Sequence, residues 1–157
     1  MRRIQFFEIH EQPWFPTTLR NEITDSLQRG SEILKAHALI SGLLQRAVAA
    51  SGTLSIVDLC SGSGGPWSDL AQKLRGDTRV YRIRLTDKFP NLHAFENVRK
   101  CSADRIDFCL SSVDATDVPL EQNGFRTMFS SFHHFSPVQA RTILQSAFNA
   151  RQGIGTV

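Results

Sequence analysis

The amino-acid sequence predicts an α/β fold in which a mostly parallel sheet carries helices on both faces. Short apolar segments rich in β-branched residues alternate with segments that have the apolar spacing of amphipathic helices. The stretch 56–70, IVDLCSGSGGPWSDL, has the pattern of a strand, a glycine-rich turn and a helix start. Polar residues follow each expected strand, as at the ligand-binding edge of parallel sheets. Right-handed crossovers then give a Rossmann-like strand order of 3-2-1-4, with the end of the chain as a candidate for part of a fifth strand.

Two helices are expected before the first strand, in an N-terminal extension that covers residues 1–52. The first begins near Thr17 and ends at Gly30, and the second has Ser31 as its N-cap and ends at Gly52. Apolar residues recur at four-residue steps along the expected inner face of the first helix: Leu19, Ile23 and Leu27.

The remaining residues, 53–157, are expected to form the sheet domain. Ser136, Pro137 and Gln139 have the pattern of an N-cap, a first helical position and a capping box. The expected elements, in order, are strand 56–59, helix 66–75, strand 79–85, helix 91–100, strand 106–110, strand 125–131, the capped helix from 137 and the partial strand 153–157.

The composition is that of an ordinary globular chain, because 41% of its 157 residues are hydrophobic and 21% are charged. No apolar run approaches the roughly 18 residues that a membrane-spanning helix needs, so we expect no membrane partner. The first residues lack the apolar segment of a signal peptide. The odd number of cysteines favours a reducing cytoplasm.

Neither a metal site nor a nucleic-acid interface is favoured. The three cysteines, Cys60, Cys101 and Cys109, form no C-x-x-C pair and lack metal-site spacing with the histidines, so we expect no bound metal. The net charge of +3 mildly favours anionic partners, but the basic residues are scattered along the chain.

The glycine-rich turn can hold an anionic or nucleotide-like ligand. Glycines allow tight backbone bends and close approach of a ligand, and the helix behind the turn presents free N–H groups. Gly62 and Gly64 match part of the G-x-G-x-x-G dinucleotide pattern, but Trp67 stands at the third glycine position. A purely structural turn is the alternative.

Two carboxylates follow later strands. Asp87 comes 23 residues after Gly64, at the end of the second expected strand, where an acidic residue accepts hydrogen bonds from ribose hydroxyls. Asp114 follows the third strand and can accept from the exocyclic amine of adenine. Helix capping and loop formation are the alternative roles for both residues.

These motifs together resemble those of the class I S-adenosylmethionine-dependent methyltransferases. VDLCSGSGG is similar to their first motif, with Cys60 in place of the usual first glycine. The later motifs are matched in order by LTDKF, SSVDATDVP and MFSSFHHFSP, and the resemblance covers about residues 54–150. Two leading helices also suit this family, in which such an extension often covers the substrate pocket.

The resemblance implies a role in binding S-adenosylmethionine for residues of each motif. Asp87 would hold the ribose, with Lys88 and Phe89 beside the adenine, and Asp58 would support the amino group of the methionine part through the turn or a water. Ser130 would offer its backbone carbonyl to that amino group. The other implied cofactor-binding residues are Cys60, Gly62, Ser63 and Gly64 in the turn, and Asp114 and Ala115 at the adenine edge.

The resemblance further implies methyl transfer to a small molecule, with S-adenosylhomocysteine as the product. Where the acceptor must lose a proton, His133 and His134 are the candidate bases, because imidazole titrates near neutral pH; packing or surface exposure is the alternative for both. The sequence SSFHHF lacks the Asn/Asp-Pro-Pro-aromatic motif typical of nucleic-acid amino-methylating relatives. It resembles the branch that acts on quinones and other small molecules.

The chain supplies fewer strands than the seven that this family normally has, so it resembles a C-terminally truncated member. We expect strand four to be an exposed edge, and pairing of two copies through it would give a homodimer. Three other functions stay open: a nicotinamide-dependent oxidoreductase, a non-catalytic adenosyl-ligand or protein-interaction module, and methylation of nucleic acid, which only the basic charge supports.

Overall fold

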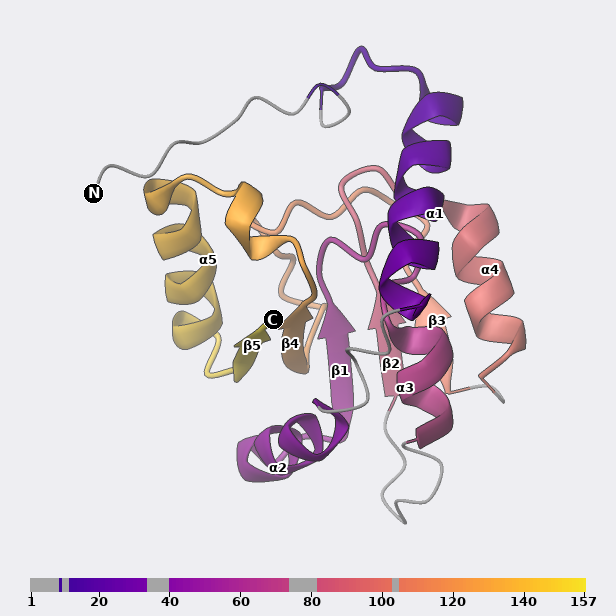
Figure 1. The fold of residues 1–157 in the computed structure, drawn as a ribbon. Coiled ribbons are helices and arrows are strands. Elements are labelled where there is room, and N and C mark those ends of the chain that lie inside the picture. The colour runs from indigo at the N-terminus through magenta and orange to yellow at the C-terminus, as the bar shows by residue number, and fades with distance from the viewer. Residues whose placement is uncertain (1–8, 10–11, 34–39, 74–81, 103–104) are drawn as a thin grey trace.

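The computed structural model describes residues 9, 12–33, 40–73, 82–102 and 105–157. Its centre is a five-stranded, all-parallel sheet in the order β3-β2-β1-β4-β5 (Figure 1). The α/β class and the strand order 3-2-1-4 are therefore confirmed. The strands are β1 (Ser55–Asp58), β2 (Arg82–Leu85), β3 (Ile106–Phe108), β4 (Phe125–Met128) and β5 (Ile154–Thr156).

Successive strand residues point to opposite faces of the sheet. Both faces carry apolar side chains, and helices bury each of them in a separate core. Ile56 of β1 packs with Leu70 and Phe95 in one core, to which α2, α3 and α4 contribute. Its neighbour Val57 packs with Ile143 of α5 in the other core. The helices are α1 (Thr17–Ile33), α2 (Ser41–Ser51), α3 (Trp67–Lys73), α4 (Leu92–Lys100) and α5 (Pro137–Asn149), with a short 3-10 helix, η4 (Phe132–His134).

The connection from β3 to β4, residues 109–124, contains no helix. Its residues Val113, Ala115 and Val118 are buried and pack in the same core as α5. This loop therefore covers part of the sheet that a crossover helix would otherwise cover.

The N-terminal helices differ from their predicted bounds. Helix α1 continues through Gly30 and Ser31, so the prediction that Ser31 caps the second helix is wrong. A glycine inside a helix costs only about 1 kcal/mol relative to alanine and does not have to end it. The predicted end of α2 is confirmed, because Gly52 caps it in the left-handed conformation with φ of 70°.

Most later elements are confirmed, with bounds that differ by a few residues where the structure describes them. The capping box of α5 is present, since the Ser136 hydroxyl accepts from the backbone N–H of Gln139 and the Gln139 side chain accepts from the backbone of Ser136. The expected end of the third helix and the start of the second strand fall within 74–81, outside the described residues.

The fourth strand is not an exposed edge. Strand β5 pairs with it in parallel register, with Arg126 opposite Ile154 and Met128 opposite Thr156. The backbone N–H of Ser130 extends the ladder by donating to the carbonyl of Val157 at 2.7 Å. The prediction of an exposed strand-four edge, on which the homodimer through that strand rested, is therefore wrong: β5 forms the edge.

Candidate functional site

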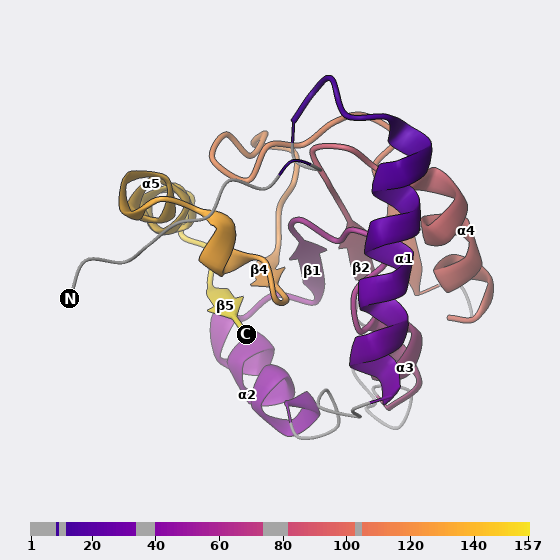
Figure 2. The ribbon, with the colours of Figure 1, turned by 45° about the horizontal axis from the view of Figure 1, so that its top comes forward.

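The carboxyl ends of β1, β2 and β4 meet at one edge of the sheet, where the glycine-rich turn follows β1 (Figures 1 and 2). The turn requires several left-handed backbone conformations. Gly62, Gly64 and Gly65 have φ of 54°, 103° and 52°, and Cys60 has φ of 57°. A Cβ atom on Gly64 would lie 2.5 Å from Cγ2 of Val98, so α4 packs directly against the turn. Cys60 thus takes the backbone conformation that glycine adopts most easily.

Asp58 lies beneath the turn and is 1% exposed. Its carboxylate accepts hydrogen bonds from Thr127 Oγ1 at 2.6 Å and from Ser61 Oγ at 2.7 Å. Burial raises the pKa of Asp58 to about 7, although these two hydroxyls and the indole of Trp67 lower it. Trp67 lowers the pKa of Asp58 less than the two hydroxyls do, because its buried N–H makes no hydrogen bond of ordinary geometry. Asp58 therefore ties β1 to β4 and to the turn, and its effect on a ligand would pass through the turn.

Asp87 joins the end of β2 to the turn. One of its carboxylate oxygens accepts from the backbone N–H of Gly62 at 2.8 Å, and the other accepts from the N–H of Phe89 at 2.8 Å. A carboxylate has about four acceptor positions. Both oxygens of Asp87 can therefore accept a further donor, such as a ribose hydroxyl.

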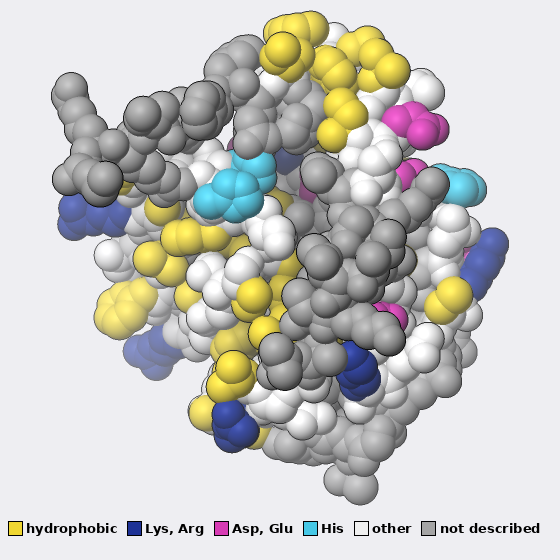
Figure 3. Space-filling view, viewed as in Figure 1, with side chains coloured by type: hydrophobic (Ala, Val, Ile, Leu, Met, Phe, Trp, Pro, Cys, Tyr) yellow, Lys and Arg dark blue, Asp and Glu magenta, His cyan; other side chains and the backbone are white. Residues whose placement is uncertain are grey.

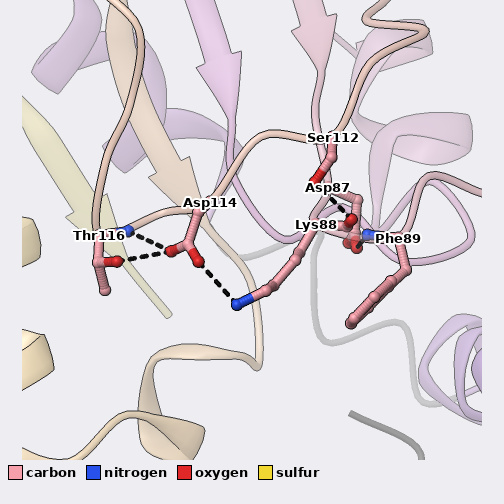
Figure 4. Close-up of polar contacts among 6 residues, drawn as sticks. All are labelled: Asp87, Lys88, Phe89, Ser112, Asp114 and Thr116. Carbon is pink, nitrogen blue, oxygen red and sulfur yellow. Dashed lines mark hydrogen bonds and ion pairs between the residues drawn. The ribbon is translucent and has the colours of Figure 1, made fainter. Parts of the chain in front are cut away.

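Lys88 and Asp114 bring the ends of β2 and β3 together (Figure 4). Lys88 Nζ lies 2.7 Å from Asp114 Oδ2, and the other oxygen accepts from the backbone N–H and the hydroxyl of Thr116. Burial opposes ionisation, but the hydrogen bonds from Lys88 and Thr116 lower the pKa of Asp114 to about 2. The hydroxyl of Ser112 also donates to the carbonyl of Lys88 at 2.7 Å. Asp114 thus braces two loops in this structure, and an adenine amine would share it with those donors.

The remaining predicted residues lie at the ends of β3 and β4. Ala115 is 3% exposed and packs in the core beside α5. Ser130 is exposed and has a φ of 51°. His133 and His134 lie in η4 with their ring centroids 4.1 Å apart, His133 exposed and His134 half-buried. Helix η4, which carries both histidines, connects the end of β4 to α5; Figure 1 shows the start of α5 at the same end of the sheet as the turn.

Sequence reasoning missed the contacts that α1 makes with the turn. Ser63 Oγ lies 2.8 Å from Thr24 Oγ1 and donates to the carboxylate of Asp25. Asp25 also accepts from the side-chain amide of Asn91 at 3.2 Å. Figures 1 and 2 both show α1 beside α3 and α4. Helix α1 therefore rests on the turn through polar side chains.

The predicted apolar face of α1 is wrong for the described residues. Leu19 is 53% exposed and Ile23 is 37% exposed, whereas Arg20 is only 6% exposed. The Arg20 guanidinium lies 3.9 Å from the centroid of the Phe89 ring and donates to the carbonyls of Gln12 and Phe15. Apolar spacing alone could not have found this face, because the helix buries a charged residue against an aromatic one.

A comparison of the chain with protein-family models and with curated protein sequences found no match. Within the described residues, no three His, Cys, Asp or Glu side chains gather in a way that could hold a metal ion. None of the described helices is both long enough and apolar enough to cross a bilayer. The functional argument therefore depends on the geometry of this edge.

Proposed function

We propose that this edge binds S-adenosylmethionine and that the chain is a methyltransferase, or the cofactor-binding portion of one, that acts on a small molecule. The observation that carries the proposal is the hydrogen bond from Gly62 N–H to Asp87. It joins a glycine-rich turn after β1 to an acidic residue after β2, in a parallel sheet of order 3-2-1-4-5. That combination favours a ligand with a ribose and an adjacent polar group.

Each residue would act on one part of the ligand. Asp87 would accept from the ribose hydroxyls, and Lys88 and Phe89 would lie beside the adenine. Asp114 and the backbone N–H of Ala115, whose side chain is buried, would contact the edge of the adenine. Cys60, Gly62, Ser63, Gly64 and Ser130 would shape the backbone around the methionine part, and Asp58 would hold that backbone from below.

The cofactor would supply an activated methyl group on a sulfonium ion, so the protein contributes mainly position and exclusion of water. His133 or His134 would accept a proton from the acceptor where the reaction releases one. Their location after β4, on the α5 side of the edge, favours an acceptor site between the turn and α5. The small-molecule class rests on the sequence SSFHHF, which lacks the nucleic-acid motif.

Calorimetric titration with S-adenosylmethionine, S-adenosylhomocysteine and NAD in parallel tests the proposal. We expect the two adenosyl-sulfur ligands to bind and NAD not to bind. Asp87→Asn should weaken binding at least about tenfold, since a hydrogen bond to a charged group contributes about 1.5–3 kcal/mol.

Asp107→Asn is the matched control, because Asp107 is an exposed carboxylate on β3, 3.6 Å from Arg84 and away from the turn. Selective binding of NAD would favour the oxidoreductase. Absence of binding by the folded chain would favour the non-catalytic interaction module.

A further inference from the structure

Helix α5 carries apolar side chains on its outer side as well as on its inner side. Ile143 and Ala147 are buried against the sheet, as expected for a helix that covers it. However, Val138 is 77% exposed, Leu144 is 45% exposed and Phe148 is 76% exposed. Isolated exposed apolar residues need no explanation, but several on one helix indicate an interaction surface.

The outer side of α5 is also hollowed. Phe132, Ala140, Leu144 and Phe148 line a groove of about 560 Å³. A second hollow of about 790 Å³ continues from Phe148 to Arg151. The two hollows share Phe148, so they form one continuous surface along the helix. We use the name α5 surface for the residues Phe132, Val138, Ala140, Arg141, Leu144, Phe148 and Arg151.

The charge of the α5 surface has a single sign. The sequence from Gln122 to Val157 contains no Asp or Glu, whereas Arg141 and Arg151 are both exposed. Arg126 does not contribute, because it is 2% exposed and donates to Gln152 and Ser146 inside the fold. Figure 3 shows apolar and arginine side chains gathered over α5, at the left of the view.

This charge pattern argues against a second copy of the chain on the same surface. Two copies related by a two-fold axis would bring the arginines of both surfaces together, without any acidic side chain of that segment to offset the repulsion. A complementary partner must instead combine apolar groups with negative charge.

We propose that the α5 surface binds an anionic lipid bilayer. Apolar side chains flanked by arginines, on a helix without acidic residues, are typical of helices that lie at a membrane surface. Phe148, Leu144 and Val138 would enter the boundary between headgroups and acyl chains, and Arg141 and Arg151 would meet anionic headgroups.

Surface binding of this kind needs no membrane-spanning helix. The expectation of no membrane partner rested on the lack of a long apolar run and does not bear on it. Phe132 links the α5 surface to His133 and His134, so the bilayer would lie next to the candidate acceptor side of the site. The lipid proposal does not depend on the identity of the cofactor.

Vesicle flotation of the full chain tests the proposal. We expect the chain to float with vesicles of phosphatidylcholine mixed with phosphatidylglycerol, and to remain in solution with phosphatidylcholine alone. Phe148→Ser should lower the bound fraction about tenfold, because losing the burial of one large apolar side chain in the bilayer has an effect of that order. Arg141→Gln should lower it about fivefold, and high salt should do the same.

The matched controls lie on α2. Leu43 is 58% exposed and Arg46 is exposed, so Leu43→Ser and Arg46→Gln make the same chemical changes on another helix and should leave flotation unchanged. Circular dichroism shows whether each variant keeps its helical content and melting temperature. These positions are exposed, so folding should be retained.

Four results would overturn the proposal. The first is no flotation with anionic vesicles, and the second is equal flotation with neutral vesicles. The third is flotation that the α2 substitutions reduce as strongly as Phe148→Ser does. The fourth is a dimer in light scattering that Phe148→Ser dissociates, which would assign the α5 surface to self-association.

Discussion

At the residue scale, the turn after β1 depends on backbone conformations that few side chains tolerate. Cys60, Gly62, Gly64 and Gly65 all have φ between 52° and 103°. The glycines were recognisable from the sequence, but the conformation of Cys60 was not, because most residues disfavour that region by about 1–2 kcal/mol. The contacts of β1 and β4 with the turn, through Asp58, hold it there.

Gly64→Ala should destabilise the fold. The new Cβ would lie 2.5 Å from Val98 Cγ2 at a φ of 103°, so both backbone strain and a clash oppose it. We expect the free energy of unfolding to fall by about 2–4 kcal/mol in urea denaturation. Gly42→Ala is the control, because nothing lies within 4 Å of its added Cβ and alanine favours the helix. Equal stability of the Gly64 variant and the wild type would contradict the geometry of the turn.

Asp58 should make stability depend on pH. Its pKa rises from 3.8 to about 7 on folding, so the folded state binds more protons than the unfolded state between these values. The free energy of unfolding then falls as pH rises through that window, by up to about 1.4 kcal/mol per pH unit. Asp58→Asn removes this contribution.

The measurement is chemical denaturation of both proteins from pH 4 to pH 8. The stability of Asp58→Asn relative to the wild type should increase with pH up to about 7 and then level off. Asp107→Asn, at an exposed carboxylate on β3, is the control for the loss of one negative charge. A difference for Asp58→Asn that does not change with pH would contradict the raised pKa of Asp58.

At the element scale, patterns that depend on neighbouring residues were predictable and patterns that depend on distant contacts were not. The capping box of α5 involves Ser136 and Gln139, three residues apart, and it is present as predicted. The inner face of α1 instead depends on Phe89 and on residues of the turn. Its polar contacts look like a solvent-exposed face in the sequence, because their partners are far along the chain.

Asp25→Ala should loosen α1 from the turn. Asp25 accepts from Ser63 and Asn91, which lie 38 and 66 residues away along the chain. We expect faster amide hydrogen exchange in α1, unchanged exchange in α5, and a loss of about 1–2 kcal/mol in unfolding free energy. Glu22→Ala changes an exposed acidic residue of the same helix and is the control. Unchanged exchange in α1 would mean that other contacts hold the helix.

At the scale of the whole molecule, strand order followed from chain order and crossover handedness, whereas the sheet edge did not. The predicted partial strand 153–157 is confirmed as the short strand β5, in which the β-branched Ile154 and Thr156 favour a strand and Gly155 weakens it. Pairing with β4 makes the strand, through backbone hydrogen bonds that composition does not reveal. The site edge was predictable because parallel strands end together, but the Lys88–Asp114 ion pair across it was not.

The sheet ends, α1 and the 109–124 loop all border the proposed cofactor site, so a ligand bound there should stabilise the whole fold. A ligand at about 100 times its dissociation constant adds about 2.7 kcal/mol to the unfolding free energy when it binds only the folded state. For a chain of this size that is a rise of roughly 5–10 °C in melting temperature. We therefore expect S-adenosylhomocysteine to raise the melting temperature in a saturable way and NAD to leave it unchanged.

The same scan on Asp87→Asn should need at least about ten times more S-adenosylhomocysteine for the same rise, because the ribose contact is weakened. Asp107→Asn should follow the wild-type curve. A rise that Asp87→Asn does not shift would mean that the ligand binds away from the turn. No rise at any concentration, with a cooperative unfolding transition, would mean that this edge holds the sheet and α1 together without serving a cofactor.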